Sequence, residues 1–328
     1  MGPGATGEES ADGRKPSIAF LGPAGTFTEE ALKSQTDLAA GSIVPKPTFA
    51  DVLDAVASGE TDIGFLPIEN SIEGTVSATL DSLVFDVDLL IQREVVLDVH
   101  MNLVARTGTD LGSIGKVLSF PHASAQCRKF LAATLPGVEL VATNSTAEAA
   151  RIVAEAGGDS EHGGAGMAAL APRLAAELYG LQVLKAGVED HPDNQTRFVA
   201  LAKRGVPART GHDRTSIVCF QREDHPGTLH AILSEFSARG INLTKLESRP
   251  TKRGLGSYCF IIDMEGHISD EVLADALRVL HAELAGVKFL GSYPTDSTDG
   301  PAARLKVDAA WRQADDWMES LRAQIEPT

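Results

Sequence analysis

The feature that most constrains the fold is a regular alternation of short apolar runs with amphipathic segments, which begins at Ser17. The runs 18–21, 43–45 and 63–67 predict strands, and the stretches between them have helical spacing. This alternation is typical of a doubly wound α/β sheet, in which each helix returns the chain to the next parallel strand. The plan repeats over 89–202, which predicts two α/β lobes.

Pairs of polar residues three positions apart mark the expected helix starts. These pairs are Thr26 with Glu29, Thr48 with Asp51, and Ser145 with Glu148. The first side chain of each pair can accept a hydrogen bond from a free N–H of the first turn. The predicted helices cover 26–38, 48–57, 123–135, 145–155 and 172–179. A long β-prone stretch over 89–104, broken near Asp98, is suited to cross between the lobes.

A different module follows a polar stretch at 203–213, which is interpreted as a linker. Beyond it the elements follow in the order βαββαβ, which is typical of a ferredoxin-like sandwich. The predicted strands cover 216–221, 243–249, 257–264 and 287–292, and the predicted helices cover 227–239 and 271–284. The tail over 303–324 has helical spacing, with Leu305, Trp311, Trp317 and Leu321 as candidate packing residues.

Composition limits the class of protein. A length of 328 residues predicts two or three domains. The formal net charge of −16 argues against nucleic acid and against an anionic membrane surface as partners, because both require a basic surface. The same charge opposes the approach of an anionic ligand. Binding of an anion would therefore depend on helix N-termini and a few local basic side chains.

The cysteines and the N-terminus predict the compartment. Cys127, Cys219 and Cys259 are widely spaced and form neither a CxxC pair nor a cluster with zinc spacing, so no disulfide or structural metal is indicated. Residues 1–16 are polar and lack the apolar core of a signal peptide, and we expect a disordered arm there. No apolar stretch is long enough to span a bilayer. These features predict a cytoplasmic protein.

Three groups of polar residues stand where predicted strands begin or end, the usual ligand position in open α/β sheets. They are Glu69-Asn70-Ser71, then Ser119 with His122 and Gln126, then Asn194 with Thr196 and Arg197. Each group also has an ordinary interpretation as turn, cap or surface residues, and His122 fits that interpretation better. Thr196 is chemically the most informative, because its hydroxyl can hydrogen-bond to a departing hydroxyl group.

Two further motifs suit anionic groups. The turn 22–28 joins a strand to a helix, where backbone N–H groups can hold an anion, although an ordinary turn explains it equally well. In the last module, Gly227 and Thr228 begin a helix and the run 247–250 ends a strand, which suits capture of a zwitterion or forms a plain turn. Cys127 is interpreted as a packing residue, since no base is identifiable near it.

Taken in order, these motifs resemble those of the monofunctional prephenate dehydratases that carry a C-terminal ACT domain, over residues 17–292. The catalytic motifs are GPAGTFTEEAL (22–32), PIENSIEGTV (67–76), SFPHASAQC (119–127), NSTAEAA (144–150), the run 168–181 and DNQTRFVAL (193–201). The regulatory motifs are HPGTLHAILSEF (225–236) and ESRP (247–250).

The resemblance implies a fold, a reaction and a set of residues. It implies an α/β, two-lobed catalytic domain like periplasmic binding proteins, with doubly wound sheets, and a ferredoxin-like ACT domain. The implied reaction is decarboxylating dehydration of prephenate to phenylpyruvate without metal or redox cofactor, with feedback by L-phenylalanine. The implied catalytic residues are Thr196, Asn70, Gln126, Ser119 and Glu69; the implied substrate-binding residues are Thr26, Phe27, Ser71, Arg197 and Phe198. The implied effector-binding residues are Gly227, Thr228, Leu229, Glu247, Ser248, Arg249 and Pro250.

The expected organisation follows from these matches. The arm is 1–16, the catalytic domain 17–203 (lobe 1 over 17–98 and 193–203, lobe 2 over 99–192), the linker 204–213, the ACT domain 214–293 and the tail 294–328, partly helical. We expect a homo-oligomer, a dimer or tetramer. The effector motif departs from the usual Gly-Ala-Leu-apolar pattern at Thr228 and His230, which leaves the strength and amino-acid preference of the effector site open.

Two alternatives stay open. In the first, the substrate of the enzyme is arogenate, and the sequence does not distinguish arogenate from prephenate. In the second, the chain is a non-catalytic cytoplasmic sensor of an aromatic ligand, since two-lobed clefts and ACT modules also serve binding alone. The polar set around Asn70, Gln126 and Thr196 favours the enzyme, because binding alone does not need a donor aimed at a leaving hydroxyl group.

Overall fold

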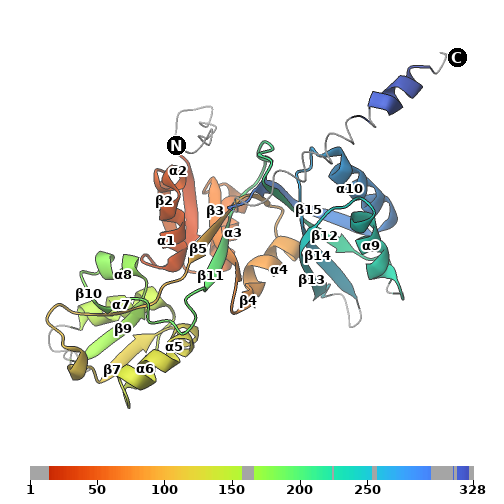
Figure 1. The fold of residues 1–328 in the computed structure, drawn as a ribbon. Coiled ribbons are helices and arrows are strands. Elements are labelled where there is room, and N and C mark those ends of the chain that lie inside the picture. The colour runs from red at the N-terminus through yellow and green to blue at the C-terminus, as the bar shows by residue number, and fades with distance from the viewer. Residues whose placement is uncertain are drawn as a thin grey trace. The chain divides into compact units, whose positions relative to one another are not determined.

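The computed structural model describes residues 15–156, 166–223, 225–252, 257–296, 313 and 316–324. Most of the predicted arm, with Leu305 and Trp311 of the tail, lies outside these residues. The chain forms two compact units (Figure 1). The first contains Met1–Ser82 and Val95–Ala200, and the second contains Leu83–Glu94 and Leu201–Thr328.

Lobe 1 is built on a sheet with the strand order β2-β1-β3-β11-β5, and β4 pairs with β3. Most of the lobe lies in the first unit, whereas residues 83–94 and 201–202 belong to the second. Its strands are β1 (Ser17–Leu21), β2 (Ser42–Lys46), β3 (Ile63–Asn70), β4 (Gly74–Thr75), β5 (Leu90–Asp98) and β11 (Gln195–Ala202). Its helices are α1 (Phe27–Ser34), α2 (Thr36–Ala39), α3 (Phe49–Ser58) and α4 (Ser77–Phe85). Strands β2 and β3 both pair with β1 in parallel, as the alternating pattern predicts.

Lobe 2 has its own sheet, with the order β10-β6-β9-β7-β8. Its strands are β6 (Asn102–Ala105), β7 (Lys116–Ser119), β8 (Glu139–Ala142), β9 (Met167–Ala171) and β10 (Gln182–Lys185). Its helices are α5 (Pro121–Gln126), α6 (Arg128–Thr134), α7 (Thr146–Glu155) and α8 (Arg173–Leu178), with a short 3-10 helix, η1 (Leu111–Ser113). Strand β7 pairs in parallel with β8 and β9, whereas β6 is antiparallel to β9.

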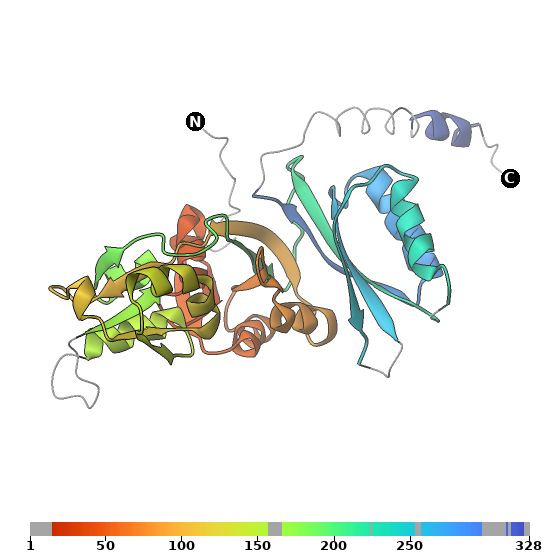
Figure 2. The ribbon, with the colours of Figure 1, turned by 60° about the horizontal axis from the view of Figure 1, so that its bottom comes forward.

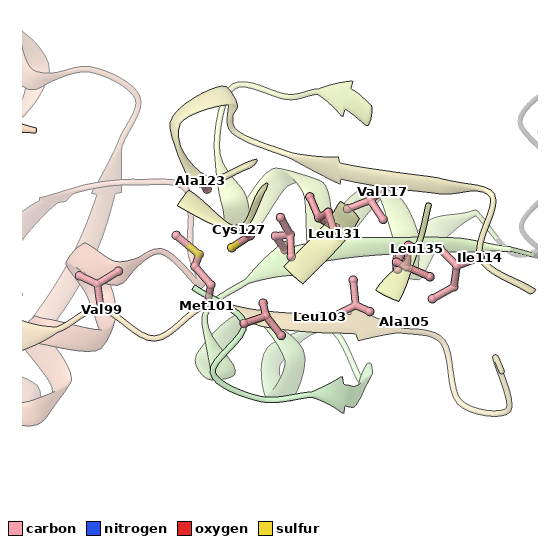
Figure 3. Packing of buried hydrophobic residues seen from close by; sticks show 13 residues of the cluster. Val99, Met101, Leu103, Ala105, Ile114, Val117, Ala123, Cys127, Leu131 and Leu135 are labelled. Carbon is pink, nitrogen blue, oxygen red and sulfur yellow. The ribbon is translucent and has the colours of Figure 1, made fainter. Parts of the chain in front are cut away.

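The core of lobe 2 explains why its central strand is apolar throughout. All five residues of β9 are buried, because helices cover both faces of the sheet. One side packs against α5 and α6, where Figure 3 shows the sulfur of Cys127 among apolar side chains. Phe27, at the start of α1, packs against this cluster and also against the core of lobe 1, so it joins the two lobes.

The second unit contains a four-stranded antiparallel sheet with the order β13-β14-β12-β15. Its strands are β12 (Asp213–Phe220), β13 (Leu243–Pro250), β14 (Tyr258–Glu265) and β15 (Gly286–Pro294), and its helices are α9 (Thr228–Ser237) and α10 (Glu271–Glu283). Both helices cover one face of this sheet (Figure 2). The order βαββαβ and the two-lobed α/β plan confirm the predicted fold class.

Some elements differ from the prediction. The helix expected over 123–135 is two helices, because Asp190 takes the hydrogen bonds that a continuous helix would use. The Asp190 N–H donates to the carbonyl of Gln126 (2.6 Å), and the Asp190 carboxylate accepts from the N–H of Lys129 (3.0 Å). Helix α4 was not predicted. In the tail, residues 316–322 are helical, but Trp317 and Leu321 are exposed rather than packed.

None of the helices in the described part of the chain combines the length and the apolar composition that a membrane crossing requires.

Candidate functional site

The structure brings two of the three predicted polar groups into direct contact within lobe 1. Asn70 ends β3, and Thr196 lies near the start of the neighbouring strand β11. The Asn70 Nδ2 group donates to Thr196 Oγ1 (2.8 Å) and to Asn194 Oδ1 (2.9 Å). Asn70 Oδ1 accepts from the N–H groups of Ile72 (2.9 Å) and Glu73 (3.0 Å), which fixes the direction in which the amide points.

Asn194 links this pair to the third group, on lobe 2. Its side chain is buried, its oxygen accepts from Asn70, and its Nδ2 donates to Oε1 of Gln126 in α5 (3.1 Å). The Asn194 carbonyl also accepts from Val99 N–H (2.7 Å), next to the first crossing between the lobes. An unbroken set of hydrogen bonds therefore runs from Gln126 to Thr196.

The turn after β3 is attached to β11 by its backbone. Ser71 N–H donates to the carbonyl of Gln195 (2.8 Å), and Gln195 N–H donates to Ser71 Oγ (2.9 Å). Ser71 therefore holds the turn in place, so that its oxygen is already engaged by the protein. The same turn carries Glu73, which sequence reasoning missed. Its carboxylate contacts His122 and Gln126 of lobe 2, and no signal beyond its place in the motif marked it.

Glu69 and Arg197 form an ion pair, with Glu69 Oε2 2.9 Å from Arg197 Nη2. Successive side chains of a strand point to opposite faces, so Arg197 and Thr196 face different sides of β11. The Arg197 guanidinium is largely buried, which strengthens its attraction to the carboxylate. The ion pair offsets the negative charge of Glu69.

Two predicted site residues are buried inside the sheets of the lobes. Ser119 is fully buried, and its hydroxyl donates to the Leu170 carbonyl of the neighbouring strand (3.0 Å). Phe198 is buried in the core of lobe 1, where its ring stacks on Phe65 with centroids 5.6 Å apart. Neither side chain is exposed to a ligand in this arrangement, because β-sheet packing covers both.

The predicted anion-holding turn is occupied by the protein itself. Thr26 caps α1, and its oxygen accepts from the N–H of Glu29 (3.5 Å). The buried Glu29 carboxylate reaches back and accepts from Gly25 N–H (2.6 Å), while Lys33 pairs with its other oxygen (2.6 Å). The capping interaction predicted for Thr26 and Glu29 is thus present, and the Gly25 N–H already has an anionic partner.

Burial makes Cys127 chemically inert. It lies inside lobe 2 with no exposed surface, and burial raises the pKa of its thiol to about 12, with Glu189 and Asp190 adding to the effect. A thiol with such a pKa is protonated near neutral pH and is a poor nucleophile. Among the described residues, no group of three or more His, Cys, Asp or Glu side chains is arranged to hold a metal ion.

A cavity of about 460 Å³ lies in the same unit but does not coincide with the polar group. Its lining comes from both lobes and includes Pro23, Lys46, Ser145 and Arg151, but none of the predicted site residues. Its two cations are already paired, Lys46 with Glu60 and Arg151 with Glu155. We therefore place the candidate site at the hydrogen-bonded group and not in this cavity.

The predicted effector residues lie on two elements of the second unit. Gly227 has a left-handed φ of 95° and precedes α9, whose first residues are Thr228 and Leu229. The Thr228 hydroxyl donates to the carbonyl of His225 (2.9 Å). The other four residues, Glu247, Ser248, Arg249 and Pro250, end the edge strand β13, where Arg249 Nη2 lies 2.7 Å from Glu247 Oε1.

Comparison with known proteins gives a consistent result. A family model described as prephenate dehydratase matches residues 18–206, and one described as ACT domain matches residues 215–282. The prephenate dehydratase of Mycolicibacterium gilvum is 44% identical over 318 residues, which cover 94% of this chain and 98% of the relative. That of Mycolicibacterium smegmatis is 43% identical over 323 residues, with the same coverage of 94% and 98%.

Comparison with solved structures finds the same similarity. The prephenate dehydratase of Arthrobacter aurescens in complex with L-Phe has a TM-score of 0.83 at 39% identity, covering 94% of this chain and 99% of that one. GqqA, described as a novel type of quorum-quenching acylase, has a TM-score of 0.74 at 30% identity, covering 85% and 98%. The first family model spans more than half of the sequence, and the curated relatives match it nearly from end to end. The chain belongs to the prephenate dehydratase family.

Proposed function

We propose that this chain converts prephenate to phenylpyruvate, carbon dioxide and water, and that L-phenylalanine regulates it through the ACT domain. The observation that carries the proposal is the hydrogen bond from Asn70 to Thr196. Because the Thr196 oxygen accepts this bond, its hydroxyl hydrogen is left to donate elsewhere. Within the described residues, no acceptor for that hydrogen is found. The Thr196 hydroxyl is thus a prepared donor for the hydroxyl group of a ligand.

The reaction needs such a donor at the bond that breaks. As the ring carboxylate leaves as carbon dioxide, its electron pair enters the ring and the ring C–O bond breaks. The departing oxygen carries developing negative charge until it takes up one proton, supplied by the solvent, and becomes water. A fixed hydrogen-bond donor at that oxygen stabilises the transition state more than the ground state. Formation of the aromatic ring drives the reaction, so the proposed chemistry uses no metal or redox cofactor.

The remaining residues orient the substrate or hold its neighbours. We assign Asn70 and Gln126 to positioning of the substrate and of Thr196, and Thr26 and Phe27 to the edge of the substrate site. The contacts of Ser71, Ser119 and Phe198 support indirect roles, in which they hold the turn, the strand end and the core. Arg197 neutralises Glu69, which lowers the repulsion that a doubly negative substrate meets.

The variant Thr196→Val tests the donor. It keeps the size of the side chain and removes the hydroxyl, so we expect kcat to fall by about 100-fold or more with little change in KM. Formation of phenylpyruvate is followed by its absorbance. Thr196→Ser restores a hydroxyl and should recover much of the rate, and Thr107→Val, in an exposed turn of lobe 2, should change nothing. Near-normal turnover of Thr196→Val would remove Thr196 from the mechanism.

For the effector we propose L-phenylalanine bound at the end of β13 and the start of α9. The similarity to a structure in complex with L-Phe supports this ligand. As an edge strand, β13 has backbone groups available to pair with another strand. We infer that a second copy of the chain adds at this edge, forming a homo-oligomer. L-Phenylalanine added to the same assay should inhibit in a saturable way.

Three alternatives are tested by other measurements. Comparing formation of phenylpyruvate from prephenate with formation of phenylalanine from arogenate decides between these two substrates. A bound aromatic acid without product would support a sensor. The similarity to GqqA makes acylase activity a further alternative, but the side chains described here do not favour it. Cys127 is buried with a pKa of about 12, and the only side chain bonded to the Thr196 hydroxyl among the described residues is Asn70, which is not a base.

We infer a cytoplasmic location, because Cys127, Cys219 and Cys259 are free thiols, as is usual in a reducing compartment.

A further inference from the structure

Glu73 connects the turn after β3 to lobe 2. Its Oε2 lies 3.1 Å from His122 Nδ1, and its Oε1 accepts from Gln126 Nε2 (3.2 Å). Both partners lie on α5, whereas Glu73 lies in the turn between β3 and β4 of lobe 1 (Figure 1). The interaction therefore joins the two lobes beside the proposed site. We propose that Glu73 is a positioning residue, a clasp that holds α5 so that Gln126 meets the Asn194–Asn70–Thr196 group.

The chemistry of the carboxylate supports this role. An ionised carboxylate only accepts hydrogen bonds, so Gln126 must turn its NH₂ group toward Glu73. Its carbonyl oxygen then faces Asn194, from which it accepts at 3.1 Å. Without Glu73 the amide of Gln126 would be held at one end only. Glu73 and Asn194 thus hold the two ends of an amide that stands two hydrogen bonds away from Asn70.

The position of Glu73 is itself controlled by the site. Its backbone N–H donates to Asn70 Oδ1 (3.0 Å), so the residue that holds Gln126 is attached to the residue that donates to Thr196. The α5 side is braced as well, because the Gln126 carbonyl accepts from Asp190 N–H (2.6 Å) and the His122 ring stacks on Phe120. The half-exposed Glu73 carboxylate therefore bridges a turn and a helix that are each attached to the rest of the unit by further contacts.

The clasp makes a specific prediction for substitutions. Glu73→Ala removes both contacts and should lower kcat/KM by about threefold, because Glu73 and His122 are about half exposed and such pairs contribute less than buried ones. Glu73→Gln can still accept from Gln126 and donate to an unprotonated His122 Nδ1, so it should retain most of the activity. Glu73→Ala should add little in a Gln126→Ala background, because it acts through Gln126. The matched control is Glu60→Ala, an exposed glutamate of lobe 1 paired with Lys46, which should leave kcat/KM unchanged.

The inference rests on the proposed function for its kinetic arm, and a second arm is independent of it. Hydrogen exchange of the α5 amides in the ligand-free full chain should be about threefold faster in Glu73→Ala than in the wild type. Unchanged exchange, additive losses with Gln126→Ala, or a Glu73→Gln variant as impaired as Glu73→Ala would each overturn the clasp. If the wild type produces no phenylpyruvate, the proposed function fails, and the exchange measurement alone decides the clasp.

Discussion

Cys127 and Cys219 show how burial sets the chemistry of a single side chain. Neither has exposed surface, and burial raises the pKa of each thiol to about 12. Cys127 also lies near the carboxylates of Glu189 and Asp190, whereas Cys219 lies near Cys259. Both effects disfavour the thiolate, which is the reactive form. The two cysteines are therefore packing residues, as the sequence predicts for Cys127.

These thiols make stability fall at high pH. The unfolded thiol titrates near 9.0 and the folded one at about 12, so the unfolded state loses its proton first as the pH rises. The stabilising contribution is complete below pH 9 and is lost as the pH rises from there to 12, by about 1.4 kcal/mol per pH unit for each thiol. Urea unfolding between pH 8 and 11 measures this slope.

The matched variants isolate the contribution of one thiol. Cys127→Ala should have a shallower pH slope than the wild type, because it removes one titrating group. Leu131→Ala, in the same apolar cluster, should be destabilised at every pH with the slope unchanged. Equal slopes in the wild type and Cys127→Ala would show that this thiol does not couple to unfolding.

At the scale of elements, features that depend on neighbouring residues could be predicted from the sequence, whereas features that depend on tertiary contacts could not. The caps at Thr26, Thr48 and Ser145 are all present, because each depends only on residues within one turn of the helix. The break at Cys127 depends on Asp190, which is far away in the sequence. Helix α4 has no predicted cap, and the hydroxyl of Thr79 in its first turn donates to the carbonyl of Pro67 in β3 (2.7 Å).

The candidate site divides in the same way. The positions of Asn70, Gln126 and Thr196 near strand ends and a predicted helix start could be read from the sequence, and hydrogen bonds join these residues, whereas their catalytic roles remain a proposal. The burial of Ser119 and Phe198 could not, since it depends on the neighbouring strand and the lobe core. Glu73 could not either, because an acidic residue in a turn is ordinary until the opposite lobe supplies Gln126.

The end of α4 depends on a lysine from the second module. Lys288 Nζ donates to the carbonyls of Val87 (2.8 Å) and Val84 (3.4 Å) and lies 3.0 Å from Asp88. A cation at a helix C-terminus satisfies carbonyls that lack helical partners. Lys288→Met keeps the apolar stem and removes the ammonium, so we expect a loss of about 1 kcal/mol in the free energy of unfolding, measured by urea.

Asp88→Asn is the control for this prediction. The Asp88 side chain is 97% exposed, so its ion pair with Lys288 should contribute little. We expect the stability of Asp88→Asn to equal that of the wild type. A loss in Asp88→Asn as large as in Lys288→Met would mean that the ion pair, and not the carbonyls, carries the effect.

At the scale of the whole molecule, the two modules are not separate stretches of chain. Composition marks a linker near 203–213, but residues 83–94, which we assigned to lobe 1 from the sequence, belong to the second unit. Reading along the chain could not predict this, because the contacts are made with residues over 100 positions later. Glu94 pairs with Arg214, and a Cβ on Gly291 would lie 2.5 Å from the Ile91 carbonyl oxygen, so only glycine permits this approach.

A chain that ends at residue 206 should therefore be unstable rather than simply unregulated. It would lose the partners of a segment in which Val84, Leu89 and Ile91 are each at most 3% exposed, and it would leave the Glu94 carboxylate without Arg214. Exposed apolar surface and a buried charge that loses an ion-pair partner are both costly. We expect a lower Tm and stronger binding of a hydrophobic dye than in the full chain.

The control is the full chain cut once at a protease site introduced within the linker. It keeps the residues after 206 that cover residues 83–94, so its Tm should stay close to that of the uncut chain. If the chain that ends at residue 206 had the same Tm as the cut full chain, the residues after 206 would not contribute to stability. Effector experiments on the intact protein then remain the direct test of regulation, because loss of inhibition on truncation would report unfolding instead.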